Sequence, residues 1–200
     1  MRLPAVLLAL ALLPGCSALS ALSDATSVLD VYELSAPEAV PQGAQRPIDV
    51  IVELPTTTGA LQTDRIMIKP SELQAQYLPD ARWGEEVPVM VQSLMLRTLQ
   101  ETEAFRYAAR EPLGLSGDIA IVSDIIDFQA VADPAGAGAT VDLRLRVQLV
   151  QEEGVRILAS RTLEGRARAT STETAAVVEA FDAASDALLT EFATWILARL

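Results

Sequence analysis

The segment V-D-L-R-L-R-V-Q-L, residues 141–149, alternates apolar with polar side chains along its whole length. In a β-strand this period of two places the apolar side chains on one face and the polar ones on the other. Glu152-Glu153-Gly154 then supplies a turn, and residues 155–168 resume a strand pattern. The two segments therefore predict an antiparallel hairpin whose apolar face lies in a core.

Shorter strand patterns precede this hairpin, and several are bounded by proline. They cover residues 30–35, 48–54, 65–69, 73–77 and 118–131. The third and fourth predict a second hairpin around Pro70 and Ser71, although residues 72–77 fit a helical turn equally well.

Two further segments have the period of amphipathic helices. In residues 85–103 the apolar positions are Val87, Met90, Val91, Leu94, Met95 and Leu99. Near the C-terminus they are Val177, Val178, Phe181, Leu188, Leu189, Phe192, Trp195 and Ile196. Ser171 or Thr172 can cap this second helix. The series predicts a single α/β domain, with a mixed, largely antiparallel sheet and two main amphipathic helices packed on it.

Composition favours binding over catalysis. The chain has 200 residues, of which 50% are hydrophobic, so it can form one globular domain. Its net charge of -12 repels the phosphate backbone of nucleic acids. It has no His and one Cys, and Lys69 is its only lysine, with no serine placed for a Ser-x-x-Lys nucleophile. We therefore expect no catalytic residues, no cofactor and no metal site.

The N-terminus predicts a signal peptide over residues 1–15. Arg2 precedes an apolar run of eleven residues, 3–13, which as a helix would span about 16 Å and could not cross a bilayer. Leu13-Pro14-Gly15-Cys16 resembles the bacterial lipobox, with Pro14 as a departure from its usual pattern. The resemblance implies cleavage before Cys16 and a diacylglycerol on its thiol. The alternative is an inert Cys16 with cleavage within residues 17–21.

The later motifs fall in an order that resembles a known family. Tyr32-Glu33-Leu34 follows the lipobox, Y-L-P-D-A-R-W (residues 77–83) leads into the first helix, and Phe105-Arg106-Tyr107 follows that helix. The C-terminal helix carries Phe181, Leu188 and Trp195. The order is similar to that of the ABC-type transport auxiliary lipoproteins, the periplasmic partners of MCE-type intermembrane lipid transport systems.

This resemblance implies a lipidated N-terminus and tether over residues 16–29 and an auxiliary domain over 30–200. It implies a membrane-anchored, non-catalytic component that supports outer-membrane lipid homeostasis, with ATP hydrolysis left to a separate cytoplasmic subunit. The implied partners are an MCE-domain protein and the ABC permease and ATPase, with phospholipid as a further candidate. Ser17, which is not Asp, implies sorting to the periplasmic face of the outer membrane. A structural or assembly lipoprotein of the envelope is the alternative.

Some polar and aromatic residues are candidates for contacts. Trp83, with Arg82 and Tyr77, is a candidate partner surface, and packing of Trp83 in the core is the favoured alternative. Arg144 and Arg146 share a strand face with Asp142, which favours a solvated charge ladder over a contact for an acidic partner.

Two further features argue against a reaction centre. Asp124 and Asp127 lie three apart in a predicted strand, so they should point to opposite faces and could not form an acid/base pair without a bulge. Gly136-Ala137-Gly138 lies between two strands and does not open a helix, so it predicts a hairpin connection and not a phosphate loop.

Overall fold

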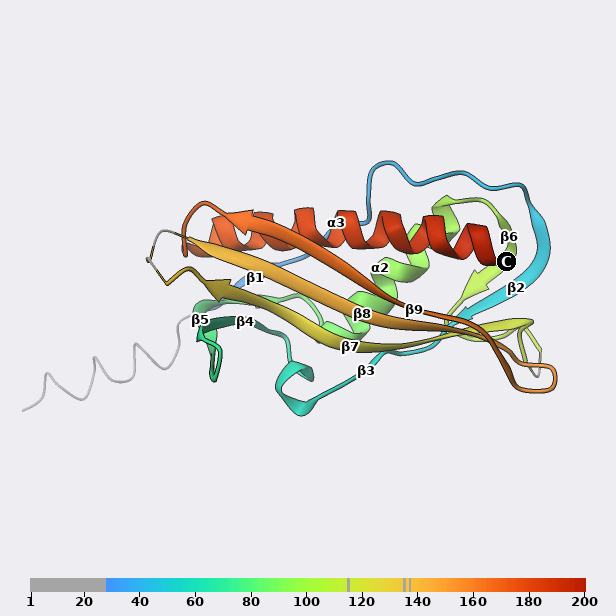
Figure 1. The fold of residues 1–200 in the computed structure, drawn as a ribbon, viewed down its shortest axis with the longest axis horizontal. Helices are drawn as coiled ribbons and strands as arrows, with labels where there is room; N and C mark the ends of the chain where they lie inside the picture. Colours follow the sequence, from blue (N-terminus) through green and yellow to red (C-terminus); the bar gives the residue numbers. More distant parts are fainter. Residues whose placement is uncertain (1–27, 115, 135, 137) are drawn as a thin grey trace, which may run out of the picture.

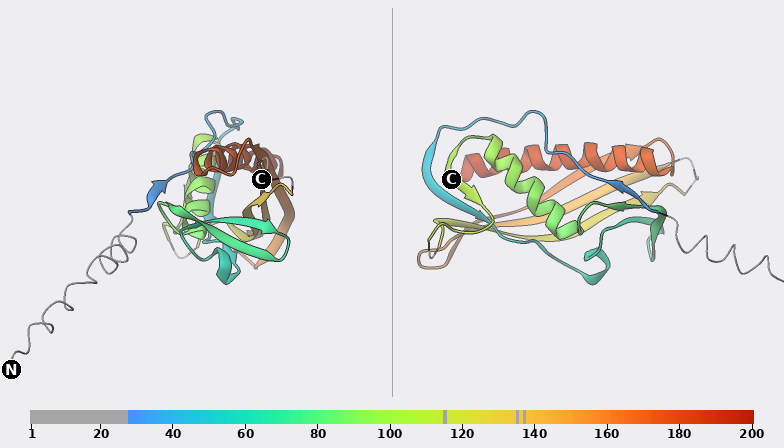
Figure 2. Two further views of the ribbon diagram at one scale, coloured as in Figure 1. Left: turned by 90° about the vertical axis from the view of Figure 1, so that its left-hand side faces the viewer. Right: turned by 180° about the vertical axis from the view of Figure 1, so that it is seen from behind.

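The computed structural model describes residues 28–200 except 115, 135 and 137. In this part of the chain a nine-stranded mixed sheet curls around two helices that cover its inner face (Figures 1 and 2). In chain order the elements are β1 (Asp30–Tyr32), β2 (Arg46–Val52), β3 (Thr56–Thr57), the 3-10 helix η1 (Gly59–Leu61), β4 (Arg65–Ser71), β5 (Gln74–Trp83), α2 (Val87–Glu101), β6 (Phe105–Ala109), β7 (Ile119–Ala132), β8 (Ala139–Gln151), β9 (Arg156–Ala169) and α3 (Thr174–Arg199).

Strand β7 is the centre of the sheet. It pairs with β8 in antiparallel fashion along its whole length, and β8 pairs in the same way with β9. Along its other side β7 pairs in parallel with β2, β3 and β4 in succession. β5 forms a hairpin with β4, while β1 adds in parallel to β5, and β6 to β2. The predicted single α/β domain with a mixed, largely antiparallel sheet is confirmed.

The alternation in β8 decides which face of the sheet is buried. Its five apolar side chains from Val141 to Leu149 are each at most 4% exposed, whereas Arg144 and Arg146 are exposed. Burial of one such leucine stabilises the fold by about 2 kcal/mol, so exposing all five side chains to water would cost several times that free energy. The turn into β9 includes Gly154 at φ 77° and Val155 at φ 46°. The predicted 141–168 hairpin is confirmed.

The second predicted hairpin is also confirmed, but its strands are longer than expected and the predicted turn around Pro70 and Ser71 is wrong, because both residues lie in β4. Its turn lies at Glu72 and Leu73, between β4 and β5, so the alternative of a helical turn over residues 72–77 is wrong. The strand predicted for 30–35 ends at Tyr32, because residues 33–45 leave the sheet.

These residues cross the helix layer as a strap (Figure 1). Ser35 N donates to Asp182 Oδ1 of α3 at 3.1 Å. Farther along, Gln42 Nε2 donates to the carbonyl oxygen of Glu101 at 2.9 Å, and Arg46 Nη2 to that of Leu197 at 3.0 Å. The strap and the first residue of β2 therefore satisfy carbonyl groups at the C-terminal ends of both helices, which have no partner within the helix.

Helix α3 lies over β8 and β9 and, with 26 residues, is about 39 Å long. The prediction that Ser171 or Thr172 caps it is wrong. Glu173 precedes the first helical residue and makes no side-chain capping bond, while Ser171 Oγ accepts a hydrogen bond from Glu173 N at 3.3 Å. Ser171 thus stabilises the turn before the helix and not the helix itself.

Helix α3 and β9 approach each other backbone to backbone at Gly165. A Cβ atom at this position would lie 2.2 Å from the carbonyl oxygen of Ala184 in α3. Glycine in the middle of a strand normally weakens it, but here the missing side chain lets the helix contact the strand directly.

Candidate functional site

The predicted site residues fall into two groups. Cys16, with Ser17 and the rest of the predicted signal peptide and lipobox, lies outside the described residues. Tyr77, Arg82 and Trp83 all lie on β5, which with β4 forms a hairpin across one end of the molecule (Figure 2, left).

Trp83 is a core residue. Its exposed fraction is 0%, and its ring packs edge-on against Phe128 and Phe181, with centroid distances of 6.2 and 5.2 Å. Trp83 is therefore not accessible to a partner. The prediction that it belongs to a partner surface is wrong. The favoured alternative, packing of Trp83 in the core, is confirmed.

The other two residues remain at the surface. Tyr77 is 40% exposed, and its hydroxyl donates to the carbonyl oxygen of Ala60 at 2.9 Å. Arg82 forms an ion pair with Asp64 at 3.2 Å. The guanidinium of Arg65 lies 5.9 Å from the centre of the Tyr77 ring, within the range of a cation–π contact. No local sequence pattern marks Arg65 as part of this surface; the pairing of β4 with β5 brings it beside Tyr77.

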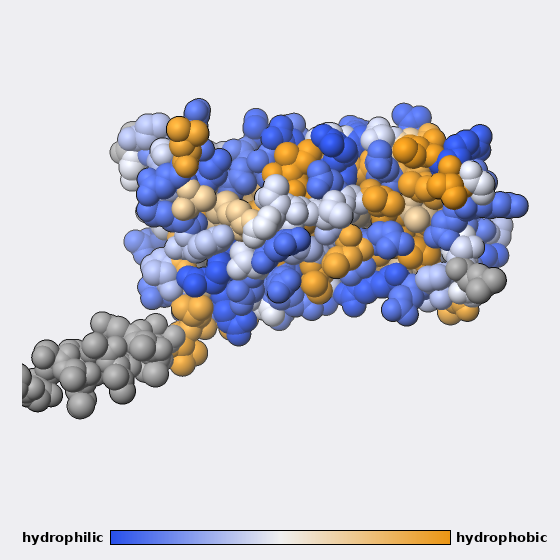
Figure 3. All heavy atoms as spheres, turned by 90° about the horizontal axis from the view of Figure 1, so that it is seen from below, coloured by the Kyte–Doolittle hydropathy of each residue, from blue (hydrophilic) through white to orange (hydrophobic). Residues whose placement is uncertain are grey.

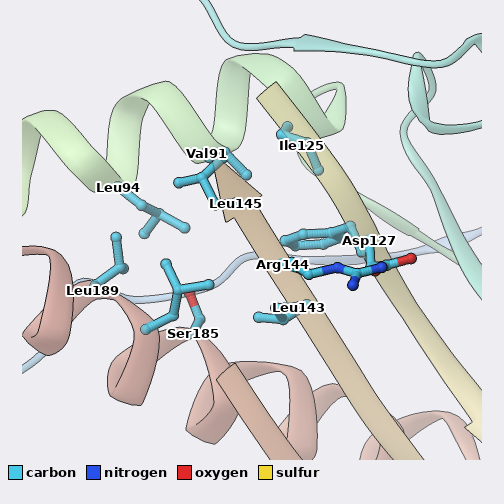
Figure 4. A pocket seen from close by; sticks show the side chains of 11 residues that line it. Val91, Leu94, Ile125, Asp127, Leu143, Arg144, Leu145, Ser185 and Leu189 are labelled. Carbon is cyan, nitrogen blue, oxygen red and sulfur yellow. The ribbon is translucent and has the colours of Figure 1, made fainter. Parts of the chain in front are cut away.

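An apolar pocket lies between the two helices and the sheet (Figure 4). Its lining residues are Val91 and Leu94 of α2, Ile125, Asp127 and Phe128 of β7, Leu143, Arg144 and Leu145 of β8, and Ser185, Leu188 and Leu189 of α3. The cavity volume is about 20 Å³, which is room for about one water molecule. In this conformation the pocket cannot enclose a lipid acyl chain.

The outer face of the sheet carries the predicted charge ladder. Its ion pairs join Arg144 to Asp127, Arg166 to Asp142 at 2.5 Å, and Arg168 to Asp133 at 2.7 Å. Because these pairs link β7, β8 and β9 in surroundings open to water, each contributes little to stability. Arg146 lies on the same face, directly opposite Asp124 in the strand register.

The predicted orientation of Asp124 and Asp127 is wrong. The pairing shifts by one residue between Ile125 and Asp127, and this bulge brings both carboxylates to the outer face. Asp124 accepts a hydrogen bond from Thr56 Oγ1 at 3.1 Å, and Asp127 is paired with Arg144. Both carboxylates are therefore engaged in contacts between strands, and the argument that they point to opposite faces no longer applies.

The Gly136 connection has the predicted form. Asp133 and Gly138 close the β7–β8 turn with a backbone hydrogen bond of 2.9 Å, and Gly136 has φ 71°. Since the turn joins two strands, it offers no helix N-terminus to a phosphate.

Two carboxyl groups have shifted pKa values. A hydrogen bond from Arg106 lowers the pKa of Asp49, and this pair joins β6 to β2. Burial raises the pKa of Asp186 on α3, with smaller contributions from the charges of Asp182 and Glu38. Asp186 Oδ1 is buried and has no hydrogen-bond partner among the described residues. Its position therefore disfavours the charged form.

Exposed apolar side chains occur at both ends of the molecule. Near the β8–β9 turn we define a distal patch, comprising Val122, Val155, Ile157 and Leu158, which are 37, 82, 58 and 40% exposed. Figure 3 shows apolar atoms gathered toward this end of the outer face. At the opposite end, Val28, Val31 and Leu73 are 92, 52 and 100% exposed.

The part of the chain that the structure describes shows neither a metal-binding cluster nor a spanning helix. It contains no group of three or more His, Cys, Asp or Glu side chains that could hold a metal ion. None of its helices is both long enough and apolar enough to cross a membrane.

Solved structures with this fold come from several bacteria. The crystal structure of protein XCC0632 from Xanthomonas campestris is similar, with a TM-score of 0.76, 22% identity, and coverage of 85% of this chain and 96% of that one. The CT253 protein of Chlamydia trachomatis has a TM-score of 0.51 at 10% identity, covering 76% of this chain and 97% of its own. At these identities the likeness concerns the fold alone.

Sequence comparisons extend the likeness to a family. An uncharacterized protein of Bradyrhizobium diazoefficiens is 27% identical over 170 residues, which are 82% of this chain but 44% of that protein. The chain thus spans less than half the length of this relative. The model of the ABC-type transport auxiliary lipoprotein component matches residues 32–193, which include every strand from β2 to β9 and most of α3. The chain therefore belongs to the family of ABC-type transport auxiliary lipoproteins.

Proposed function

We propose that this protein is a lipid-anchored, non-catalytic auxiliary component of an MCE-type lipid transport system, on the periplasmic face of the outer membrane. The family match over residues 32–193 is the observation that carries the proposal, because it makes the chain an auxiliary component of ABC-type transport. In this proposal residues 1–15 are a signal peptide, Cys16 carries the lipid, and residues 16–29 are a tether. Ser17 supports sorting to the outer membrane.

The physical basis of the anchor is hydrophobic. Acyl chains contribute about 0.8 kcal/mol per buried methylene, so two or more hold a protein on a bilayer almost irreversibly. Loss of residues 1–15 removes one basic side chain, Arg2, which leaves 14 basic and 27 acidic side chains and a net charge of -13. Electrostatic attraction to anionic lipids therefore does not contribute, and retention depends on Cys16.

The domain would act through contacts with other proteins. The apolar pocket between the helices and the sheet, at about 20 Å³, is too small for a lipid acyl chain, and the larger hollows of about 120, 230 and 490 Å³ are lined mostly by polar groups, which favours a docking role over a carrier role. The distal patch offers apolar side chains to a partner, and apolar residues surrounded by polar ones are typical of such interfaces. The partners in this proposal are the MCE-domain protein and the ABC permease and ATPase complex. Tyr77 and Arg82 stay candidate contact residues because both lie at the surface.

Site-specific photo-crosslinking in intact envelopes tests this proposal. A photoreactive residue at Ile157, in the distal patch, should capture an MCE-domain protein or a permease subunit. Glu179, an exposed residue of α3, is the matched control and should capture much less. Deletion of the gene should also weaken the outer-membrane barrier to detergents. Capture of peptidoglycan or outer-membrane assembly proteins, with no MCE protein or permease subunit among them, would replace this proposal with a structural lipoprotein.

A further inference from the structure

The end of the molecule opposite the distal patch carries apolar side chains that the fold leaves uncovered. The described chain begins there at Val28, which is 92% exposed, and Val31 of β1 is 52% exposed. Leu73 at the β4–β5 turn is 100% exposed. β1 pairs with the C-terminal part of β5, while Leu73 precedes its first residue. These apolar residues therefore flank β5, which at about 3.3 Å per residue extends roughly 30 Å.

The tip of the β4–β5 hairpin is open to solvent on both of its faces at this end. Figure 2, left, looks onto the hairpin from this end and shows it lying across the opening of the curled sheet. Almost every residue from Ser71 to Asp80 is exposed, Leu78 being the exception. Tyr77 lies on this surface with its ring held by its hydrogen bond to Ala60. A tyrosine side chain combines an apolar ring with a polar hydroxyl, so its place between exposed apolar side chains is suited to the boundary between water and lipid.

The position of Val28 brings this end close to the proposed anchor. Eleven residues lie between Cys16 and Val28, so the Cα atoms of these two residues can be at most about 43 Å apart. Helix α3, which runs along the length of the domain, is about 39 Å long. The chain from the proposed anchor thus enters the domain at the Val28 end, and the distal patch lies at the opposite end of the domain.

The charge of this end selects the kind of lipid surface. Asp30, Glu72 and Asp80 are all exposed there, while Lys69 and Arg65 on β4 carry positive charge and Arg82 is paired with Asp64. Because these opposite charges nearly balance, the surface offers anionic headgroups little attraction, and the net charge of -13 of the chain without residues 1–15 opposes them, whereas zwitterionic headgroups are not repelled.

We propose that the end formed by Val31, Tyr77 and Leu73 docks on a zwitterionic phospholipid bilayer, with Leu73 inserted at headgroup depth. This inference rests on the proposed lipid anchor at Cys16. The anchor keeps this surface at a high effective concentration over the bilayer, so a few apolar contacts suffice to orient the domain. Docking in this way would point the distal patch into the periplasm, where a partner can reach it.

Fluorescence quenching by lipids can test the orientation. The full lipidated chain is reconstituted in phosphatidylcholine vesicles, and a Leu73→Cys variant is labelled with an environment-sensitive fluorophore. Cys16 is the only native cysteine, so in the acylated protein position 73 carries the single free thiol. Val155→Cys, at the distal turn, is the matched control. Spin-labelled lipids should quench the label at 73 at least about threefold more than the label at 155. Replacing half of the phosphatidylcholine with an anionic lipid at low salt should reduce that difference.

Equal quenching at the two positions would overturn the orientation. So would a spectral shift at position 73 that occurs without vesicles and grows with protein concentration, because a second copy of the chain would then cover Leu73. Failure of the anchor itself has a different signature. The unsubstituted protein would then not remain with the vesicles, and it would take up the label only where processing left Cys16 in the chain.

Discussion

The contact between β9 and α3 makes Gly165→Ala a severe substitution. The new Cβ would lie 2.2 Å from the carbonyl oxygen of Ala184 and 3.0 Å from Leu188 Cβ. Relief of the first contact needs more than 1 Å of movement, because an ordinary contact of this kind is at least about 3.4 Å, and the nearest atom belongs to a helix backbone. Overpacking of a core costs about 1–3 kcal/mol, and a fixed backbone atom places this case at the upper end. We expect a loss of about 3 kcal/mol in the free energy of unfolding.

Urea unfolding followed by far-UV circular dichroism measures this loss. For a chain of this size, a loss of about 3 kcal/mol lowers the Tm by roughly 6–12 °C. Gly59→Ala is the matched control, because a Cβ at Gly59 meets nothing within 4 Å, and it should change stability by less than about 1 kcal/mol. If Gly165→Ala unfolds at the same urea concentration as the control, the backbone contact does not limit the packing of α3 as we infer.

Three other substitutions test separate parts of the molecule. Cys16→Ser should leave an unprocessed precursor or a soluble periplasmic protein, and an unmodified thiol in the mature wild type, measured by intact mass, would contradict the lipid anchor. Leu145→Asp should unfold the domain, since Leu145 is 3% exposed, whereas the neighbouring Arg146→Gln should cost less than about 0.5 kcal/mol. Denaturant midpoints compare the two, and similar losses would mean that the burial of β8 is wrong. Asp186→Asn should stabilise the protein at neutral pH, because burial raises the pKa of Asp186 and so penalises its charged form. As the pH falls through that raised pKa toward the ordinary value of 3.8, the penalty and hence the advantage of the variant disappear. Thermal unfolding as a function of pH would show this convergence, and a constant difference between Asp186→Asn and wild type would count against it.

The orientation and burial of a residue are harder to predict from the sequence when they depend on contacts with residues far along the chain. Asp124 and Asp127 face the same side only because β7 has a bulge opposite β8, and no local pattern marks that extra residue. Core packing of Trp83 was only the favoured alternative to a surface position, since its burial depends on Phe128 and Phe181, which lie far along the chain. The cap expected at Ser171 or Thr172 failed because several polar residues precede α3, and each is a plausible start.

The sequence by itself determined the features that local periodicity encodes. The alternation over residues 141–149 specified a strand and its buried face, and the three- and four-residue spacing specified two helices, because side-chain direction repeats with the backbone. The tertiary structure alone decided that three short strands share one side of β7, that residues 33–45 cross both helices, and that Gly165 contacts α3. It also decided that β1 and the β4–β5 hairpin lie at the same end of the molecule (Figure 1). These arrangements arise from pairings between residues far apart in the chain, whose register is set by the packing of the whole core.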